Sequence, residues 1–391
     1  MASVMTDFSS TPPSECAMKR IKVVHVIGGF NRGGVEAWLL TLARTIDRER
    51  FQIDFIVNTT SPCVYDDAIY QCGSRIISCA HPSKPWRYGR RFRAILDFFG
   101  PYDVIHSHVH YFSGYILRLA EQASIRGRVV HSHSDTSLID GASSLPRMLY
   151  LAAMRREIRR YATAGVAASR KAAAALYGAQ WRQDPRWQIL YCGIDLAPFH
   201  GVVDYERVRE EHGIPKDGWV VGHVGSFTAP KNHPFLIRLG LEVLKRVPNS
   251  YLLMVGDGPL RLALELDTAK SPLRNRVRFF GNRDDVPRLL MGAMDAFLFP
   301  SLWEGLPLSL IEAQAAGLPC IISDVITEEA DVVPEAITRL SLDASMERWV
   351  DAVLRTRNWR LDRQRARFSV ANSPFNSETS TRELEKLYAT L

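Results

Sequence analysis

Two carboxylates in one continuous segment are the side chains best placed to orient a ligand. The segment FLFPSLWEGLPLSLIEAQAAGLPCIISD, residues 297–324, carries Glu304 and Glu312 at a spacing of eight residues. This separation suits two parts of an elongated ligand better than one shared proton. A helix that starts between the two glutamates presents free backbone N–H groups and the positive end of its dipole, which favour a phosphate. Because carboxylates repel a phosphate, we expect both glutamates to accept hydrogen bonds from sugar and ribose hydroxyls.

The elements around these glutamates are typical of a parallel α/β sheet. The apolar run 296–300 is short and continuous, as in a strand covered on both faces. Gly305 permits a tight turn, and Pro307 suits the first position of a helix over 308–316, which Gly317 can end. The start of this helix faces the carboxyl end of the sheet, where open α/β folds bind ligands. The alternative is that the two glutamates are an ordinary loop charge and an ordinary surface residue.

The same residues carry a resemblance to a known family. The E-x7-E arrangement, with EGLP at its front and EAQAAGLP at its end, resembles the signature of retaining glycosyltransferases of family 4, or group 1. The similarity runs from about Ile21 to Tyr388 and is greatest to the bacterial branch of capsular and exopolysaccharide assembly. It implies an α/β chain of the GT-B fold, in which two Rossmann-like domains with parallel sheets face each other across a cleft. The C-terminal domain would hold a nucleoside-diphosphate sugar, and the N-terminal domain would hold the acceptor.

Length and composition agree with two domains. The chain has 391 residues, of which 46% are hydrophobic and 23% charged, near the norm for globular proteins. We expect a disordered extension over 1–19 and an N-terminal domain over 20–196, which a C-terminal helix over 376–391 completes. The nucleotide-sugar-binding domain would cover 197–375. Because the start lacks the apolar core of a secretory signal, and no apolar run is long enough to cross a bilayer, we expect a cytoplasmic protein.

The resemblance assigns donor-binding residues in the second half. Glu304 would orient the donor sugar and Glu312 would hold the ribose, while Gly305, Leu306 and the helix start would bind the phosphates. Lys231 follows the apolar strand 220–227 and precedes a helix. A cation there would stabilise the charge that builds on the leaving nucleoside diphosphate.

Two positions depart from the pattern of the resembled family. Ser226 stands where an arginine is usual, and the loss of one charge-assisted hydrogen bond would weaken phosphate binding by roughly 1.5–3 kcal/mol. Arg283 could compensate, and Arg283 and Val286 are candidates for contacts at the nucleobase or its rim. In the crossover between domains, ILYCGIDLAPF, Cys192 replaces the usual asparagine.

A glycine loop opens the first half. The predicted strand KVVHVIGGF ends in Gly28 and Gly29, and Gly33 follows just before an amphipathic helix. Such a loop lets the backbone approach a ligand closely. By resemblance, Gly28 and Gly29 would reach the donor phosphate, and Gly33 would lie on the acceptor side. A plain strand-to-helix turn is the alternative.

Histidines crowd the ends of the next predicted strands: His106, His108, His110, His131 and His133. A His-x-His pair can chelate a metal, but no acid or cysteine completes an evident set, and the resembled enzymes need no metal. We therefore expect neither a metal nor another cofactor. By resemblance, His133 would hydrogen-bond the sugar near the reacting carbon or the acceptor, and it joins Glu304 and Lys231 as a candidate catalytic residue. His108 is placed on the acceptor side, with a structural role as the alternative.

The formal charge of +7 is partly clustered in the first half. Residues 81–93 and 148–160 combine arginines and lysine with aromatic and apolar side chains. Such segments can dock on anionic lipid, at about 1 kcal/mol per basic residue near the surface. An ordinary solvated face is the alternative, and no nucleic-acid recognition motif accompanies either cluster.

With the resemblance, these residues imply transfer of a sugar from a nucleoside-diphosphate sugar, with UDP favoured, to a hydroxyl acceptor with retention at the anomeric carbon. The acceptor would be a lipid-linked or growing saccharide in bacterial surface polysaccharide synthesis. No residue is an evident nucleophile, so the departing phosphate would accept the proton of the acceptor hydroxyl. An epimerase or hydrolase on the same fold, and a catalytically weakened binding subunit suggested by Ser226, are the alternatives.

Overall fold

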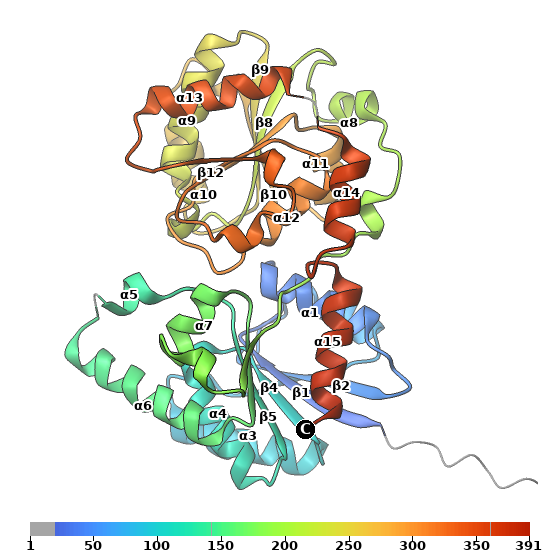
Figure 1. Ribbon diagram of the computed structural model, residues 1–391, viewed down its shortest axis with the longest axis vertical. Coiled ribbons are helices and arrows are strands. Elements are labelled where there is room, and N and C mark those ends of the chain that lie inside the picture. Colours follow the sequence, from blue (N-terminus) through green and yellow to red (C-terminus); the bar gives the residue numbers. More distant parts are fainter. Residues whose placement is uncertain (1–19, 142, 360) are drawn as a thin grey trace, which may run out of the picture.

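The structure is a computed structural model that describes residues 20–391 except residues 142 and 360. The predicted extension, residues 1–19, lies outside the described residues. Two units of similar design lie one above the other, and each has a parallel sheet between layers of helices (Figure 1). The predicted α/β architecture with two parallel sheets is therefore confirmed.

The first unit has a seven-stranded sheet in the order β3-β2-β1-β4-β5-β6-β7. Its strands are β1 (Ile21–Ile27), β2 (Phe51–Val57), β3 (Ile76–Ser78), β4 (Val104–Ser107), β5 (Gly127–Ser132), β6 (Ala164–Ala167) and β7 (Trp187–Ile189). Its α-helices are α1 (Gly34–Thr45), α2 (Asp66–Gln71), α3 (Pro85–Phe99), α4 (Ser113–Gln122), α5 (Ser137–Gly141), α6 (Leu145–Tyr161), α7 (Arg170–Tyr177) and the C-terminal α15 (Ser377–Ala389).

The second unit has a six-stranded sheet in the order β10-β9-β8-β11-β12-β13. Its strands are β8 (Trp219–Val224), β9 (Ser250–Val255), β10 (Val277–Gly281), β11 (Ala296–Phe299), β12 (Cys320–Ser323) and β13 (Ile337–Leu340). Its α-helices are α8 (Tyr205–Glu211), α9 (His233–Arg246), α10 (Arg261–Thr268), α11 (Val286–Gly292), α12 (Leu308–Ala315), α13 (Met346–Arg355) and α14 (Arg363–Ala371).

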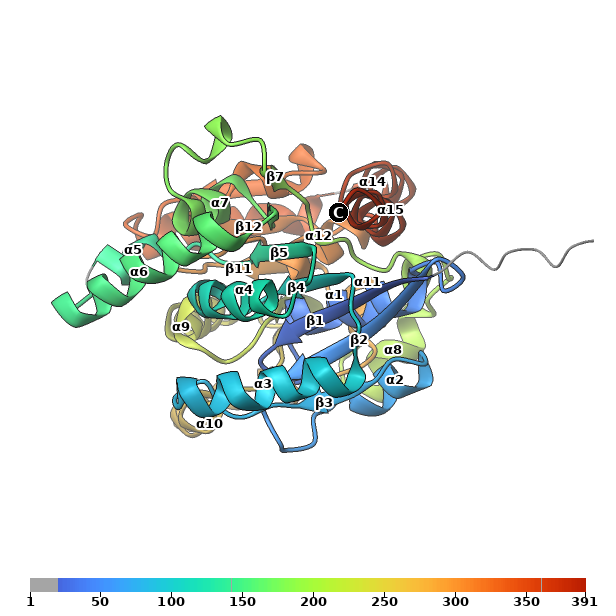
Figure 2. The same ribbon diagram turned by 90° about the horizontal axis from the view of Figure 1, so that it is seen from below.

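Helices cover both faces of each sheet, which explains why the strands are mostly apolar. In β1, Val24 and Val26 pack with residues of α3, α4 and α7 on one face. Val23 and Ile27 pack with residues of α1 and α15 on the other face (Figure 2). The strand order reverses between β1 and β4 and between β8 and β11. In a doubly wound sheet, ligands bind outside the carboxyl ends of the strands at this reversal.

The chain crosses between the units at two segments that lie side by side. The Ile194 N–H donates to the Phe375 carbonyl at 2.8 Å, and the Ser377 N–H donates to the Ile194 carbonyl at 3.0 Å. A Cβ on Gly193 would lie 2.5 Å from the Ser377 Cα, so the pairing requires glycine there. Beyond this crossing, α15 packs on α1 and places Tyr388 in the core of the first unit.

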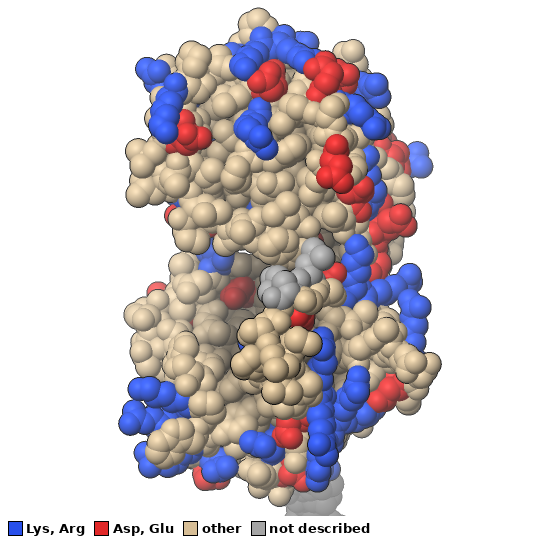
Figure 3. Space-filling model, turned by 90° about the vertical axis from the view of Figure 1, so that its left-hand side faces the viewer, with Lys and Arg blue, Asp and Glu red and all other residues tan. Residues whose placement is uncertain are grey.

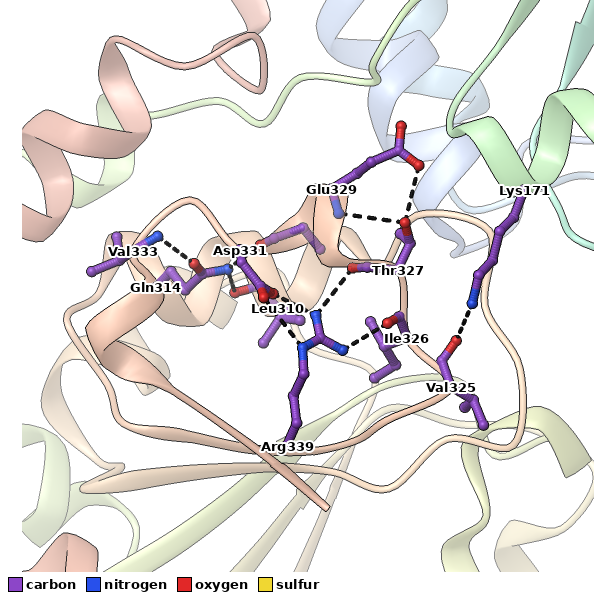
Figure 4. A network of polar contacts seen from close by, with 11 residues as sticks. Lys171, Leu310, Gln314, Val325, Ile326, Thr327, Glu329, Asp331, Val333 and Arg339 are labelled. Carbon is purple, nitrogen blue, oxygen red and sulfur yellow. Dashed lines mark hydrogen bonds and ion pairs between the residues drawn. The ribbon is translucent and has the colours of Figure 1, made fainter. Parts of the chain in front are cut away.

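The segment between β12 and β13 is tied to α12, and Figure 4 shows the contacts. The Gln314 side chain of α12 accepts a hydrogen bond from the Val333 N–H at 2.8 Å. Arg339 of β13 donates to the Ile326 carbonyl at 2.6 Å and pairs with Asp331 at 2.6 Å. These bonds fix α12, which carries a predicted site residue, against the sheet.

The same segment contacts α7 of the first unit. Lys171 donates to the Val325 carbonyl at 2.7 Å, and the Glu329 carboxylate accepts the Arg170 N–H at 2.9 Å (Figure 4 labels Lys171, Val325 and Glu329). The Tyr191 hydroxyl also donates to Glu329, at 2.8 Å. The two units are thus held together on this side by polar contacts. None of the described helices combines the length and apolar character that crossing a membrane requires.

Candidate functional site

A cavity of about 770 Å³ lies between the two units, and Figure 3 shows the molecule hollowed there. Both units contribute to its wall, at the ends of the strands where each sheet reverses its order. The predicted site residues that line it are Gly33, His133, Ser226, Lys231, Arg283, Val286, Glu304, Gly305, Leu306 and Glu312. Gly28, Gly29 and His108 lie outside its lining. The structure therefore brings ten of the thirteen predicted residues to one cavity.

Lys231 and Glu304 form an ion pair in the cavity wall. The Lys231 Nζ lies 2.6 Å from the Glu304 Oε1, and the two side chains are 16% and 10% exposed. The ammonium also lies 4.8 Å from the ring centroid of Phe299. Asn232, in the left-handed region with φ of 53°, donates from its side chain to the Pro300 carbonyl at 3.1 Å. This bond holds the two loops together, so cation and carboxylate present one fixed pair to a ligand.

The start of α12 faces the cavity with open backbone donors. The helix runs over Leu308–Ala315, close to the predicted 308–316, but Pro307 occupies the cap position and not the first helical position that we expected. A proline has no side-chain acceptor, so nothing caps this end of the helix. Leu308 and Ser309 both line the cavity. Their N–H groups and the helix dipole make this end suited to an anion.

Gly305 lies where the two units approach each other closely. A Cβ at this position would lie 1.9 Å from the carbonyl oxygen of His133 and 2.9 Å from the Cα of Ser134. Both of those atoms belong to the first unit. Any larger residue at 305 would push the two walls of the cavity apart.

Glu312 carries a carboxyl group with an altered pKa. It is half-buried in the cavity wall on α12 and has no hydrogen-bond or ion-pair partner among the described residues. Burial raises the pKa of Glu312 to about 7. An unpaired, half-buried carboxyl is costly to ionise, so this group is free to take a hydrogen-bonding partner from the cavity.

Arg283 is already paired, which limits its ability to replace the arginine expected at 226. Its Nε and Nη2 donate to the two carboxylate oxygens of Asp285, each at 2.8 Å. These bonds lower the pKa of Asp285. Ser226 is exposed at the cavity, and its hydroxyl lies 3.2 Å from that of Thr228.

A second arginine, which the sequence reasoning passed over, spans the cavity. Arg32 lies in the glycine loop before α1, and its Nη2 lies 2.8 Å from the Asp284 carboxylate of the second unit. Its Nη1 is buried and has no hydrogen-bond partner within residues 20–391, residues 142 and 360 excepted. A cation among the glycines of a ligand-facing loop was the available signal, but its acidic partner is distant in sequence and could not be read locally.

His133 is held as a neutral imidazole at the cavity wall. Its Nε2 lies 2.9 Å from the His108 Nδ1, and its Nδ1 lies 3.8 Å from the Cys192 sulfur. Burial lowers the pKa of His133 to about 3. His108 therefore supports His133 from behind and does not face the cavity itself.

Histidines of three adjacent strands lie close together behind the wall. In two groups of three, one ligand atom from each residue lies within 4.8 Å of the others: His25, His106 and His108, and His108, His131 and His133. The sequence offered no third ligand for a His-x-His pair, whereas the sheet supplies one from a neighbouring strand. The expectation that the protein needs no metal stays a prediction.

Comparison with known proteins gives the family. The model of Glycosyltransferase Family 4 matches residues 32–198, and that of Glycosyl transferases group 1 matches residues 204–369. A Bacillus subtilis (strain 168) protein assigned as the glycosyltransferase EpsF is 37% identical over 339 residues, which are 85% of this chain and 87% of that protein. The chain is a group 1 glycosyltransferase of family 4. It is thus a transferase, as the sequence predicted.

Solved structures agree on the fold of this glycosyltransferase. HepE from Anabaena, in complex with UDP-glucose, aligns with a TM-score of 0.77 at 19% identity, over 95% of this chain and all of that one. WaaG, a glycosyltransferase involved in lipopolysaccharide biosynthesis, aligns with a TM-score of 0.69 at 19% identity, over 95% and 98% of the two chains. The predicted GT-B fold is confirmed.

One relative of this glycosyltransferase has a fully named reaction. The UDP-Gal:alpha-D-GlcNAc-diphosphoundecaprenol alpha-1,3-galactosyltransferase of Escherichia coli is 34% identical over 137 residues, 34% of this chain and 35% of that protein. The match covers only part of both chains, so it does not by itself assign a substrate here.

Proposed function

We propose that this glycosyltransferase moves a sugar from a UDP-sugar to a hydroxyl of a lipid-linked or growing saccharide, with retention, during assembly of a bacterial surface polysaccharide. The observation that carries the proposal is the composition of one cavity wall. The paired Lys231 and Glu304, the open start of α12 and the unpaired Glu312 all line it. A nucleotide sugar offers a diphosphate to the cation and helix start, and hydroxyls to the two carboxylates.

The relatives support the choice of donor and acceptor class. HepE is bound to UDP and UDP-glucose, and the E. coli relative uses UDP-Gal and a diphosphoundecaprenol-linked acceptor by name. Our proposal extends these chemistries to this chain, with Glu304 on the donor sugar and Glu312 on the ribose.

The charges in the cavity support retention without a covalent enzyme intermediate. Glu304 is held by Lys231 at 2.6 Å, which suits a hydroxyl acceptor better than a nucleophile. His133, with a pKa lowered to about 3, is a weak base. In the proposed step, the acceptor hydroxyl attacks the anomeric carbon as its bond to the diphosphate breaks, and the hydroxyl proton passes to a diphosphate oxygen. The protein positions both reactants, and Lys231 stabilises the leaving charge.

The test is nucleoside diphosphate release from purified protein supplied with UDP-, GDP- and ADP-sugars, with and without a bacterial lipid extract. We expect release from UDP-sugars only, dependence on the extract, and loss in Glu304→Ala but not in Glu242→Ala, an exposed glutamate of α9. The anomeric configuration of the product, read by NMR, tests retention. Conversion of the sugar without extract would favour an epimerase or hydrolase, and binding without turnover would favour a binding subunit.

A lipid-linked acceptor would lie in the membrane, so the proposal includes docking of the protein on the anionic lipids of the inner face of the cytoplasmic membrane. Leu145, Met148 and Leu149 of α6 are 68%, 53% and 64% exposed, and Trp86 at the start of α3 is 77% exposed. Lys and Arg gather on the lower half of the face in Figure 3, which is the side of α6. We expect sedimentation with phosphatidylglycerol vesicles at low salt and not with phosphatidylcholine vesicles, and its loss in Leu149→Asp. Equal binding to both vesicle types would refute the charge-based docking.

A further inference from the structure

An unbroken line of hydrogen bonds runs from the cavity to the C-terminal helix. The His133 Nε2 lies 2.9 Å from the His108 Nδ1, and the His108 Nε2 lies 2.9 Å from the His25 Nδ1. The His25 Nε2 lies 3.3 Å from the Tyr388 hydroxyl, which in turn lies 2.6 Å from the His106 Nδ1. Of these five side chains, only His133 lines the cavity. The line therefore connects the substrate side of the first unit to α15.

Because burial keeps these histidines neutral, the donors and acceptors along the line can be arranged in only two ways. Burial lowers the pKa of both His25 and His133 to about 3, so their imidazoles are neutral. A neutral imidazole carries one N–H donor and one lone pair. His25 and His108 each use both nitrogens, so the bonds from His133 to Tyr388 must all run inward from the cavity or all run outward. The direction decides whether the His133 Nδ1 is an acceptor or a donor.

The contacts of Tyr388 favour the inward direction. An O–H donor makes shorter hydrogen bonds than an N–H donor. The short 2.6 Å contact is therefore the phenol donating to His106, and the 3.3 Å contact is His25 donating its Nε2–H to the phenol oxygen. The His25 Nδ1 must then accept from His108, and the His108 Nδ1 must accept from His133. This leaves the His133 Nδ1 with a free lone pair, and the Cys192 thiol, a weak donor, lies 3.8 Å from it.

We propose that Tyr388 is a positioning residue that acts through His25 and His108 to hold His133 as the Nε2–H tautomer. His133 then presents an acceptor to the cavity, so the substrate group beside it is a hydroxyl that donates a hydrogen bond. A phosphate oxygen or a carbonyl, which can only accept, finds no donor there. The identity of the substrate in this inference rests on the proposed function, whereas the tautomer of His133 does not.

Trp38 shields the line from the cavity. Its ring lies edge-on to His131 at 5.2 Å and to His108 at 6.0 Å between centroids, and it also lines the cavity. His25, His106 and Tyr388 are fully buried, whereas His108 and His133 are half-buried. The buried inner part of the line keeps one direction of hydrogen bonding, because no solvent molecule can replace one of its members.

Histidine ¹⁵N NMR of the whole protein reads the tautomers directly. We expect His133 as a single Nε2–H tautomer in the wild type, and a mixture of both tautomers in Tyr388→Phe, which keeps the ring and removes the hydroxyl. In UDP-sugar turnover, kcat should fall roughly fivefold to tenfold, as for the loss of one hydrogen bond, with KM for the donor unchanged. Tyr88→Phe is the matched control, because it removes another buried phenol of the same unit, one that donates to Asn58 at 3.0 Å. It should change neither readout.

A second variant keeps the test independent of Tyr388. His108→Asn breaks the line in the middle and should mix the His133 tautomers to the same extent, and the double variant with Tyr388→Phe should add nothing further. An Nδ1–H tautomer in the wild type, or an unchanged tautomer in Tyr388→Phe, would overturn the proposal. So would a stoichiometric metal ion in the purified protein, because the same nitrogens would then be its ligands. Absence of transfer from every UDP-sugar would contradict the proposed function, while the NMR result would still decide the tautomer.

Discussion

Donor binding should become tighter as the pH rises, because Glu312 must ionise to accept ribose hydroxyls well. Its carboxyl group lines the cavity without a partner in the described part of the chain, and burial raises its pKa to about 7. Near neutral pH, about half of the molecules would carry the neutral acid. If only the ionised form binds the donor fully, the apparent dissociation constant is the intrinsic constant divided by the fraction of Glu312 that is ionised.

The size of the effect follows from that pKa. With a pKa of about 7, the ionised fraction rises from about one tenth at pH 6 to about nine tenths at pH 8, so UDP-glucose affinity should increase about tenfold. UDP-glucose is the right probe, since each of its phosphates carries only one, strongly acidic group and does not titrate in this range, whereas the terminal phosphate of UDP does. Glu312→Gln, which cannot ionise, should bind at one weak, pH-independent affinity.

Isothermal titration calorimetry across this range tests the reasoning, and Glu242→Gln on the exposed face of α9 serves as the matched control. A wild-type affinity that does not change with pH, or a slope that persists in Glu312→Gln, would refute the role of Glu312.

The stability of the protein gives a second test of the same pKa, and here a rise in pH lowers the measured quantity. Because the folded-state pKa is raised, from 4.5 to about 7, the contribution of Glu312 to stability is fully present below pH 4.5 and is lost as the pH rises through 7. Glu312→Gln should therefore be more stable than the wild type at pH 8, by at most about 3 kcal/mol.

Three further substitutions test the contacts across the cavity. Gly305→Ala places a carbon 1.9 Å from the His133 carbonyl oxygen, so donor affinity measured by calorimetry should fall by about 1–3 kcal/mol, whereas Gly201→Ala, with nothing within 4 Å, should leave it unchanged. Arg32→Ala removes the ion pair between the units, and we expect small-angle scattering to show a more open molecule; an unchanged profile would exclude a role in closure. Lys231→Met should lower UDP release roughly 10²- to 10³-fold, with uridine binding little changed.

The local pattern of the second half was enough to predict its part of the site. The run around Glu304 and Gly305 encodes strand, turn and helix within a few residues, so periodicity and turn chemistry predicted the helix to within one residue at its end. Pro307 was placed one position too far into the helix, because cap and first-turn prolines share the same sequence signal. The end of the helix and the position of this proline are both features that neighbouring residues determine.

Features that depend on the third dimension were beyond the sequence. The pair of Arg32 and Asp284 joins two loops of different units, and no local pattern couples them. Strand-end polarity correctly placed His133 at the cavity, but whether His108 faces the cavity or the interior depends on how the residues past each strand end turn. Gly28 was chosen for its residue type, and the cavity instead begins further along the same loop.

Three of the cations that line the cavity explain how it can select a whole nucleotide sugar. Lys231, Arg32 and Arg283 each already pair with a carboxylate, so a bare diphosphate gains little by replacing one anion with another. A nucleotide sugar differs, because it brings hydroxyls that can satisfy the displaced carboxylates, Glu304 among them. The exchange then leaves no buried acid without a partner, and the open N–H groups of α12 add their own bonds to the diphosphate. Inorganic pyrophosphate should therefore bind at least about tenfold more weakly than UDP-glucose, although it carries more charge.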